Sequence, residues 1–225
     1  MKPDAITVAV NETGGVTALV YRAASKKQAG ATLVLGHGAG ADQTHHFMVS
    51  FAEGLASRGI DAVTFNFLYT EQRRKVPDRG DKLETCYRAV ISAVMNDRTL
   101  ASNELFIGGK SMGGRIASQV AADGVEGLRG LVFLGYPLHP PGKPDQPRSK
   151  HLPRIGLPML FVQGTRDPFG TPDELAPLIN GFKPRASVHE IKEGDHSFKV
   201  PKKTGLSEEH VYRSALDSIA AWMMT

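Results

Sequence analysis

The 225-residue sequence has little cysteine and no long apolar run, and each absence excludes a class of protein. A single cysteine, Cys86, rules out an internal disulfide framework, and its place in an apolar helical stripe predicts a buried thiol in a reducing, cytoplasmic location. No stretch approaches the roughly 18 apolar residues of a membrane span, and the segment after Met1 lacks the apolar core of a secretory signal. The sequence therefore predicts neither secretion nor a membrane partner.

The chain also lacks a strong excess of charge of one sign. Its 27 Lys and Arg residues are spread along the chain and nearly matched by 23 Asp and Glu, for a formal net charge of +4. The densest basic segments, 72–75 and 199–203, are short and flanked by loop residues. Solvated loop charge is the favoured interpretation of both, and no nucleic-acid partner is expected.

Length and an apolar fraction of 41% predict one domain, 1–225, with one core. Segments 6–10 and 16–22 flank a turn-prone Gly14–Gly15 and predict an antiparallel hairpin. Short apolar runs then alternate with helical patterns, which predicts an α/β fold: a mostly parallel central sheet with the hairpin at its N-terminal end and helices on both faces. Strands are expected at 32–35, 62–67, 104–107, 131–134, 159–163 and 188–191, and helices at 47–57, 82–95, 112–122, 173–179 and 208–223.

Two local features refine this outline. Asp81 and Glu84 stand at the spacing of a capping box before the second helix. The stretch from Tyr136 to Leu157 carries repeated prolines that prevent a regular helix through most of it, so we expect a loop that borders an open site and no large lid domain.

The strongest chemical signal is Gly109-Lys110-Ser111-Met112-Gly113, between a predicted strand and a predicted helix. A serine on such a tight turn projects its hydroxyl beyond the sheet edge, and the crowding requires glycine two residues before and after it. Ser111 is therefore the candidate nucleophile, and the Met112 N–H is a candidate oxyanion donor at the helix start. A phosphate-binding loop is disfavoured because position 104 is Glu, where that motif needs Gly.

A second glycine-rich turn, 36–42, follows the strand expected at 32–35. In hydrolases of this plan the loop after this strand supplies the other oxyanion N–H, for which Ala39 is preferred and Gly40 is next. His37 precedes the turn and is expected to be structural, with its ring bonded to the backbone, rather than a catalytic base.

Asp42, His45 and His46 follow this turn and raise the possibility of a metal site. Adjacent histidines cannot readily converge on one ion, and no cysteine supports them. We therefore expect no metal and no cofactor, and we interpret the three side chains as substrate contacts at the rim of the pocket.

An acid and a base follow later strands. Asp167 ends the turn after the strand at 159–163, and His196 follows the strand at 188–191. With Ser111 they occur in the chain order nucleophile, acid, base, which differs from the orders of chymotrypsin and subtilisin. The sequence thus predicts a Ser111–His196–Asp167 triad, with Asp195 the weaker acid candidate because it adjoins the histidine.

Four segments, 36–42, 65–69, 108–115 and 194–198, together resemble the small α/β-hydrolase family that is sometimes grouped with dienelactone-hydrolase-like proteins. The resemblance runs from about Thr32 to the end of the chain, and Gly108-Gly109-Lys110-Ser111-Met112-Gly113-Gly114-Arg115 is its most specific part. It implies the α/β-hydrolase fold and the triad, for substrates that are poorly defined in the family. Leu68 departs from it, since a proline is expected there.

These observations predict a serine hydrolase that cleaves a small-molecule carboxylic ester or thioester through an acyl-enzyme intermediate. Phe67, Leu68, Tyr69 and Tyr136 are expected to line the pocket. The alternative is an inactive or weakly active scaffold that serves as a protein-interaction module, a role the resemblance leaves open for some eukaryotic relatives. Intact triad positions argue against that alternative, and the oligomeric state cannot be read from the sequence.

Overall fold

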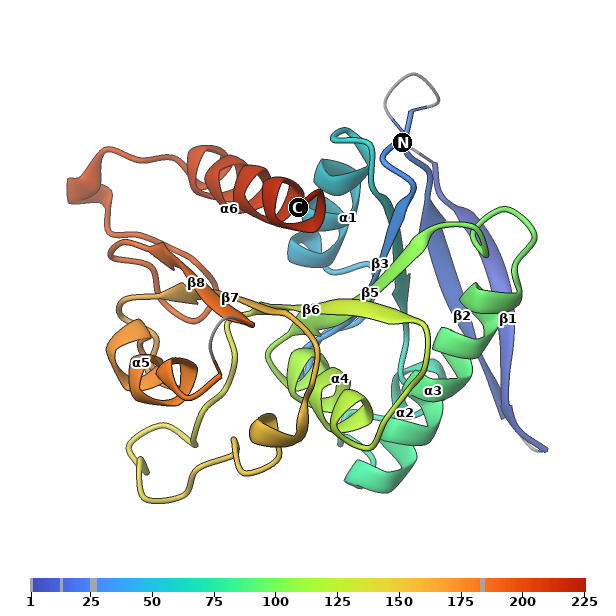
Figure 1. The fold of residues 1–225 in the computed structure, drawn as a ribbon, viewed down its shortest axis with the longest axis horizontal. Coiled ribbons are helices and arrows are strands. Elements are labelled where there is room, and N and C mark those ends of the chain that lie inside the picture. Colours follow the sequence, from blue (N-terminus) through green and yellow to red (C-terminus); the bar gives the residue numbers. More distant parts are fainter. Residues whose placement is uncertain (1, 13, 25–27, 183–184) are drawn as a thin grey trace.

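A computed structural model describes residues 2–12, 14–24, 28–182 and 185–225, and its central feature is one eight-stranded sheet (Figure 1). Across the sheet the strands follow the order β1-β2-β4-β3-β5-β6-β7-β8. The strands are β1 (Asp4–Asn11), β2 (Gly14–Tyr21), β3 (Ala31–Gly36), β4 (Asp61–Phe65), β5 (Glu104–Lys110), β6 (Leu128–Leu134), β7 (Met159–Gly164) and β8 (Ala186–Ile191).

The pairing confirms the predicted fold class. β1 and β2 form an antiparallel hairpin that joins the sheet antiparallel to β4, while every pair from β4 to β8 is parallel. β3, β4 and β7 are buried at every position. Strands covered on both faces read as continuous apolar runs, which explains why the sequence located them.

Helices cover both faces of the sheet, as Figure 1 shows. On one face, α1 (His46–Ala56) and α6 (Glu208–Met223) contribute to one apolar cluster. On the other face, α3 (Gly80–Asn96), α4 (Met112–Ala122) and α5 (Pro172–Asn180) pack into a second cluster. All five predicted helices are therefore present, with bounds that differ by one or two residues at most ends.

Three short elements escaped prediction: α2 (Leu68–Glu71) and the 3₁₀ helices Leu152–Arg154 and Lys202–Thr204. A helix of three or four residues is too short to show a 3.6-residue period. The predicted capping box was wrong, because α3 begins at Gly80 with Arg79 at its N-cap and no side-chain cap bond. A capping box is present instead at the start of α5, between Thr171 and Glu174.

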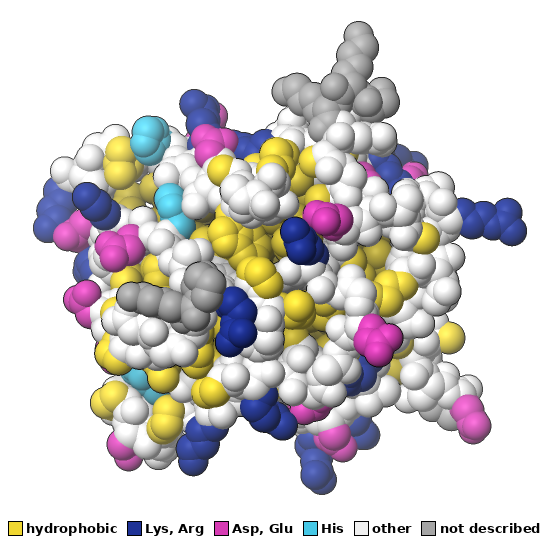
Figure 2. Space-filling model, viewed as in Figure 1, with side chains coloured by type: hydrophobic (Ala, Val, Ile, Leu, Met, Phe, Trp, Pro, Cys, Tyr) yellow, Lys and Arg dark blue, Asp and Glu magenta, His cyan; other side chains and the backbone are white. Residues whose placement is uncertain are grey.

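Surface charge is mixed on the face drawn in Figure 2, where basic side chains stand among acidic ones. Within the described ranges, no helix combines the length and the apolar character needed to cross a bilayer.

The sheet brings the motif-bearing loops together. After β3 the chain continues to β4 on one side of β3, and it later returns to β5 on the other side of β3. The direction in which strands are added to the sheet therefore reverses between β3 and β5. Ligand sites of open α/β sheets lie at such a switch, beyond the carboxyl ends of the strands. The loop after β3, which begins at His37, and the turn at Ser111 meet there, because Gly36 and Gly109 are register partners.

Candidate active site

Ser111 lies in the sharp turn between β5 and α4, with φ 51° and ψ −113°. This backbone conformation is unfavourable for a residue with a Cβ, and it persists only where the surroundings enforce it. A Cβ at Gly109 or at Gly113 would fall on the Gly36 carbonyl oxygen. Both glycines of the motif are therefore required by close backbone approach.

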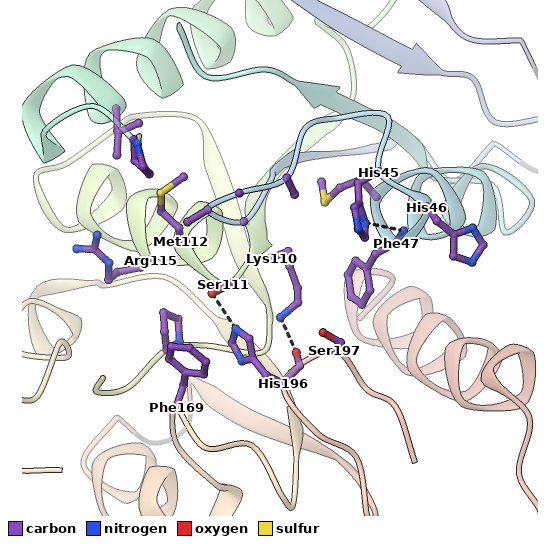
Figure 3. A pocket seen from close by; sticks show the side chains of 18 of the residues that line it. His45, His46, Phe47, Lys110, Ser111, Met112, Arg115, Phe169, His196 and Ser197 are labelled. Carbon is purple, nitrogen blue, oxygen red and sulfur yellow. Dashed lines mark hydrogen bonds between the residues drawn. The ribbon is translucent and has the colours of Figure 1, made fainter. Parts of the chain in front are cut away.

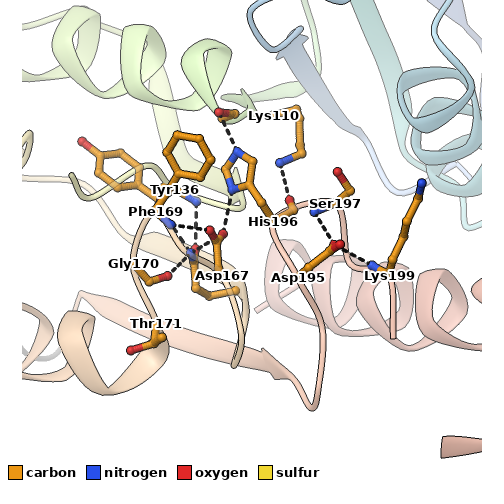
Figure 4. Close-up of polar contacts among 12 residues, drawn as sticks. Lys110, Tyr136, Asp167, Phe169, Gly170, Thr171, Asp195, His196, Ser197 and Lys199 are labelled. Carbon is orange, nitrogen blue, oxygen red and sulfur yellow. Dashed lines mark hydrogen bonds and ion pairs between the residues drawn. The ribbon is translucent and has the colours of Figure 1, made fainter. Parts of the chain in front are cut away.

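A chain of two short hydrogen bonds joins Ser111, His196 and Asp167. The Ser111 hydroxyl lies 2.8 Å from His196 Nε2 (Figure 3), and His196 Nδ1 lies 2.7 Å from Asp167 Oδ2 (Figure 4). An ionised carboxylate only accepts, so Nδ1 carries the hydrogen of a neutral ring and Nε2 is left to accept from the serine. In this tautomer the histidine can take the serine proton.

The Asp167 side chain is buried and held in place by two further donors (Figure 4). Gln163 Nε2 donates to Oδ2 at 2.9 Å, and the Phe169 N–H donates to Oδ1 at 2.8 Å. Gln163 also donates to the Gly170 carbonyl at 2.6 Å, which fixes the amide. Such bonds stabilise a buried carboxylate and hold it towards the histidine.

His196 is restrained on two further sides. The Phe169 ring contacts the imidazole, with centroids 4.2 Å apart and ring planes tilted by 31°. Lys110 Nζ donates to the His196 carbonyl at 2.5 Å and lies 5.6 Å from the centroid of the Phe47 ring (Figure 3). Burial lowers the Lys110 pKa to about 8, against the opposing charges of Asp167 and Asp195.

Asp195 does not contact the histidine ring. Its Oδ1 accepts the backbone N–H groups of Ser197 and Lys199, at 2.7 and 3.0 Å, and so shapes the loop that carries His196 (Figure 4). Asp167, whose carboxylate contacts the ring, stays the predicted partner of the histidine.

A pocket of about 800 Å³ opens over Ser111 and His196. Ala39, Gly40 and Met112 line it, so both candidate oxyanion loops border the same space as the serine hydroxyl. Met112 is the first residue of α4, where backbone N–H groups have no partner within the helix. The arrangement offers donors to an oxygen that develops negative charge near Ser111.

His37 is structural, as expected. The ring is completely buried, its Nδ1 lies 2.8 Å from the Gly38 carbonyl, and the Phe67 N–H donates to its Nε2 at 3.2 Å. Because an N–H group must donate, Nε2 accepts and Nδ1 carries the hydrogen. Burial lowers the His37 pKa, so the neutral ring is favoured.

Two of the three predicted rim residues border the pocket. His45 and His46 line it, although His45 also accepts the Phe47 N–H at the start of α1, and His46 lies 3.0 Å from Glu208. Asp42 is absent from the lining, because its carboxylate accepts the backbone N–H and hydroxyl of Thr44, both at 2.7 Å. Within the described ranges, no three metal-ligating side chains converge.

The prediction that Phe67, Leu68, Tyr69 and Tyr136 line the pocket was wrong. The three aromatic side chains are almost completely buried in the core, and Leu68 packs against that core beside Gly14. Apolar side chains at a strand end satisfy core packing as well as a binding pocket, and here the core takes all four.

The actual lining includes several residues that sequence reasoning missed. Phe169, two residues after Asp167, could have been suspected from its position in the turn. Arg148 lies in the proline-rich loop, and Phe47 and Tyr212 lie on α1 and α6, where nothing in their pattern distinguishes pocket from surface or core. Arg115 also lines the pocket.

Other serine–histidine contacts lack the features of the Ser111 arrangement. Ser118 Oγ lies 2.7 Å from His151 Nε2, but Ser118 is completely buried and also donates to the Arg115 carbonyl. Ser50 Oγ lies 3.5 Å from His46 Nδ1, at the limit of a hydrogen bond, on the exposed surface of α1. Ser111 alone among these three serines lines the 800 Å³ pocket.

Comparisons with known proteins assign the chain to a family and show similar folds. Residues 29–224 match the model of a family described as an α/β hydrolase domain. A serine hydrolase without a lid from Xanthomonas campestris is 19% identical, with 99% of this chain and 95% of that chain covered and a TM-score of 0.75. A dienelactone hydrolase from Anabaena variabilis is 16% identical, with 100% and 98% covered and a TM-score of 0.77.

Est1E from Butyrivibrio proteoclasticus is 14% identical, with 96% of this chain and 99% of that chain covered and a TM-score of 0.70. At these sequence identities the solved structures show a similar fold and nothing further about function.

Proposed function

Because the chain belongs to the α/β hydrolase domain family, we propose that it is a serine hydrolase that cleaves a carboxylic ester or thioester through an acyl-enzyme intermediate. The observation that carries this proposal is the hydrogen-bonded series from Ser111 through His196 to the buried Asp167, at the floor of a pocket. In this proposal Ser111 is the nucleophile, His196 is the general base and Asp167 orients the ring.

The first half-reaction forms the acyl-enzyme. Ser111 Oγ attacks the carbonyl carbon while its proton passes to His196 Nε2, and Asp167 stabilises the imidazolium that results. The carbonyl oxygen becomes an oxyanion that accepts from the N–H groups of Met112 and Ala39, with Gly40 the next candidate. When this intermediate collapses, the carbon–oxygen or carbon–sulfur bond breaks and His196 returns the proton to the leaving alcohol or thiol.

The second half-reaction uses water in place of Ser111. His196 takes a proton from the water as its oxygen attacks the acyl carbon, and the proton then passes to Ser111 Oγ as the acid is released. No step requires an oxidant, a reductant or a group that the chain does not carry.

The pocket supports a small-molecule substrate. Its volume of about 800 Å³ falls within the ~300–1,000 Å³ of typical ligand pockets. The proline-rich loop between β6 and β7 contributes Pro137 and Arg148 to one wall. An enzyme of the cytoplasm fits the near absence of cysteine and the burial of Cys86, whose pKa burial raises to about 12.

The test is hydrolysis of 4-nitrophenyl esters and of acyl thioesters by the purified protein and by Ser111→Ala. Loss of the nucleophile is expected to reduce kcat on the order of a million-fold. The matched control is Ser50→Ala, because Ser50 also contacts a histidine but lies outside this pocket, and it should retain full activity. Undiminished turnover by Ser111→Ala would refute the proposal.

A further inference from the structure

Two arginines, Arg115 and Arg148, line the pocket that holds the candidate nucleophile. Arg115 is one helical turn after Ser111 on α4, where its N–H donates to the Ser111 carbonyl at 3.0 Å, and its side chain lines the pocket. Figure 3 places Arg115 with Met112 on one side of Ser111, opposite Phe47. Four residues of α-helix span roughly 6 Å, so the Arg115 backbone lies one turn from Ser111, and in Figure 3 the guanidinium is the end of the side chain farther from the serine.

The second arginine, Arg148, comes from the proline-rich loop and is held there by its backbone. Its N–H donates to the Leu138 carbonyl at 2.7 Å, and its carbonyl accepts from the Tyr136 hydroxyl at 3.2 Å. Tyr136 is itself buried beneath the pocket wall. These bonds fix the point from which the Arg148 side chain reaches the pocket lining.

Neither arginine forms a short ion pair within the described ranges, although the carboxylate of Glu84 acts on Arg115 at longer range. Within the described ranges, neither guanidinium lies within ion-pair distance of a carboxylate, and the hydrogen bond of the Arg115 side chain goes to Gln119 at 3.4 Å. Burial lowers the pKa of the half-buried Arg115, and the positive charge of Arg148 is the next cause. The two like charges therefore act on each other across a shared space, which is unfavourable without an anion between them.

The carboxylates that line the pocket are already engaged. Asp78 accepts from Arg74 at 2.8 and 2.9 Å through both its oxygens, and Glu208 lies 3.0 Å from His46 Nε2. Tyr136 offers no negative charge, since burial raises its pKa to about 12. The pocket thus presents two guanidinium groups without short ion pairs among the described residues, while Asp78 is paired with Arg74 and Glu208 contacts His46.

From this arrangement we propose that Arg115 and Arg148 form a carboxylate-binding subsite, and that the substrate is an ester or thioester carrying a carboxylate a short alkyl chain from the scissile carbonyl. The inference rests on the proposed function. A carboxylate accepts paired N–H groups from a planar guanidinium, and a charged acceptor makes these bonds stronger than neutral ones. Phosphate offers a similar charge but is tetrahedral and larger, and it serves as a comparison ligand in the test.

The turnover test compares mono-4-nitrophenyl adipate with its methyl ester, in which a neutral ester replaces the carboxylate, after subtraction of the rate without enzyme. The native protein is expected to prefer the carboxylate substrate by about 10- to 100-fold in kcat/KM. Arg115→Gln and Arg148→Gln should abolish that preference, mainly by raising KM for the carboxylate substrate. Arg154→Gln is the matched control, since Arg154 is exposed, pairs with Asp123 and lies outside the lining.

A second readout does not depend on turnover. The Ser111→Ala protein should bind monomethyl adipate in a calorimetric titration. Adding Arg115→Gln or Arg148→Gln to that protein should weaken the binding at least tenfold. Inorganic phosphate should bind the Ser111→Ala protein more weakly than monomethyl adipate does. Turnover with no charge preference and no such binding would overturn the subsite alone. Binding without turnover would uphold the subsite and overturn the proposed function. Absence of both would overturn both.

Discussion

The strained backbone at Ser111 leads to a prediction that reverses the usual ranking of alanine and glycine. A side chain with a Cβ at φ 51° and ψ −113° costs about 1–3 kcal/mol, and glycine avoids that cost. In regular structure glycine is less stable than alanine by about 0.5–1 kcal/mol, because it loses more chain entropy on folding. At the midpoints of these ranges the difference leaves Ser111→Gly more stable than Ser111→Ala by roughly 1 kcal/mol.

The comparison isolates strain because both variants lose the same hydrogen bond to His196. Urea unfolding followed by circular dichroism should give a higher midpoint for Ser111→Gly at equal slope, and both variants should be inactive. The control is the same pair at Ser92, an exposed position within α3, where alanine should be the more stable by about 0.5–1 kcal/mol. A Ser111→Ala variant as stable as Ser111→Gly would refute the assignment of strain to this turn.

Three further changes test other parts of the structure. Gly113→Ala should prevent stable folding, because the added Cβ would overlap the Gly36 carbonyl. The control is Gly156→Ala, which has open space around the added Cβ and should change the urea midpoint little. A stable Gly113→Ala protein would contradict the close approach of Gly113 to Gly36. The pKa of Lys110 is about 8 when folded, below its ordinary 10.5, so the unfolded chain binds more protons between these values. Lys110 should therefore raise the free energy of unfolding as pH increases from 8 to 10.5, and Lys110→Met should lack this increase. Identical pH dependence of the unfolding free energy in the two proteins, measured by urea titration, would contradict the lowered Lys110 pKa. Thr171→Ala removes the capping box of α5 and should lower the free energy of unfolding by about 1 kcal/mol in the same assay, and no change would mean that the cap contributes nothing.

The parts of the fold that the sequence predicted are those where one physical requirement dominates. Parallel strands covered on both faces must be apolar, so 32–35 and 159–163 stood out as strands. The tight turn at Ser111 demands glycine on both sides, and the structure gives each glycine a specific backbone neighbour. Local patterns of this kind are visible in one sequence because the constraint acts on adjacent residues.

The predictions that failed depended on contacts between distant segments. Tyr136 was expected in the pocket, yet its ring packs against Phe133 and Phe161 in the core. Arg148 was not suspected, because its place in the pocket depends on how an irregular loop folds back over α4. The capping spacing at Asp81 was misleading since α3 begins one residue earlier, and the register of a helix start depends on the incoming chain as well as on residue type.

The central claim is that Ser111 is an activated nucleophile, and the most direct measurement is intact mass after treatment with a fluorophosphonate probe. This probe modifies an activated serine whatever the natural substrate is. We predict that the native protein gains the mass of one probe molecule, that Ser50→Ala does the same and that Ser111→Ala gains none. A folded native protein that stays unmodified, or a Ser111→Ala variant that is labelled to the same extent, would contradict the account.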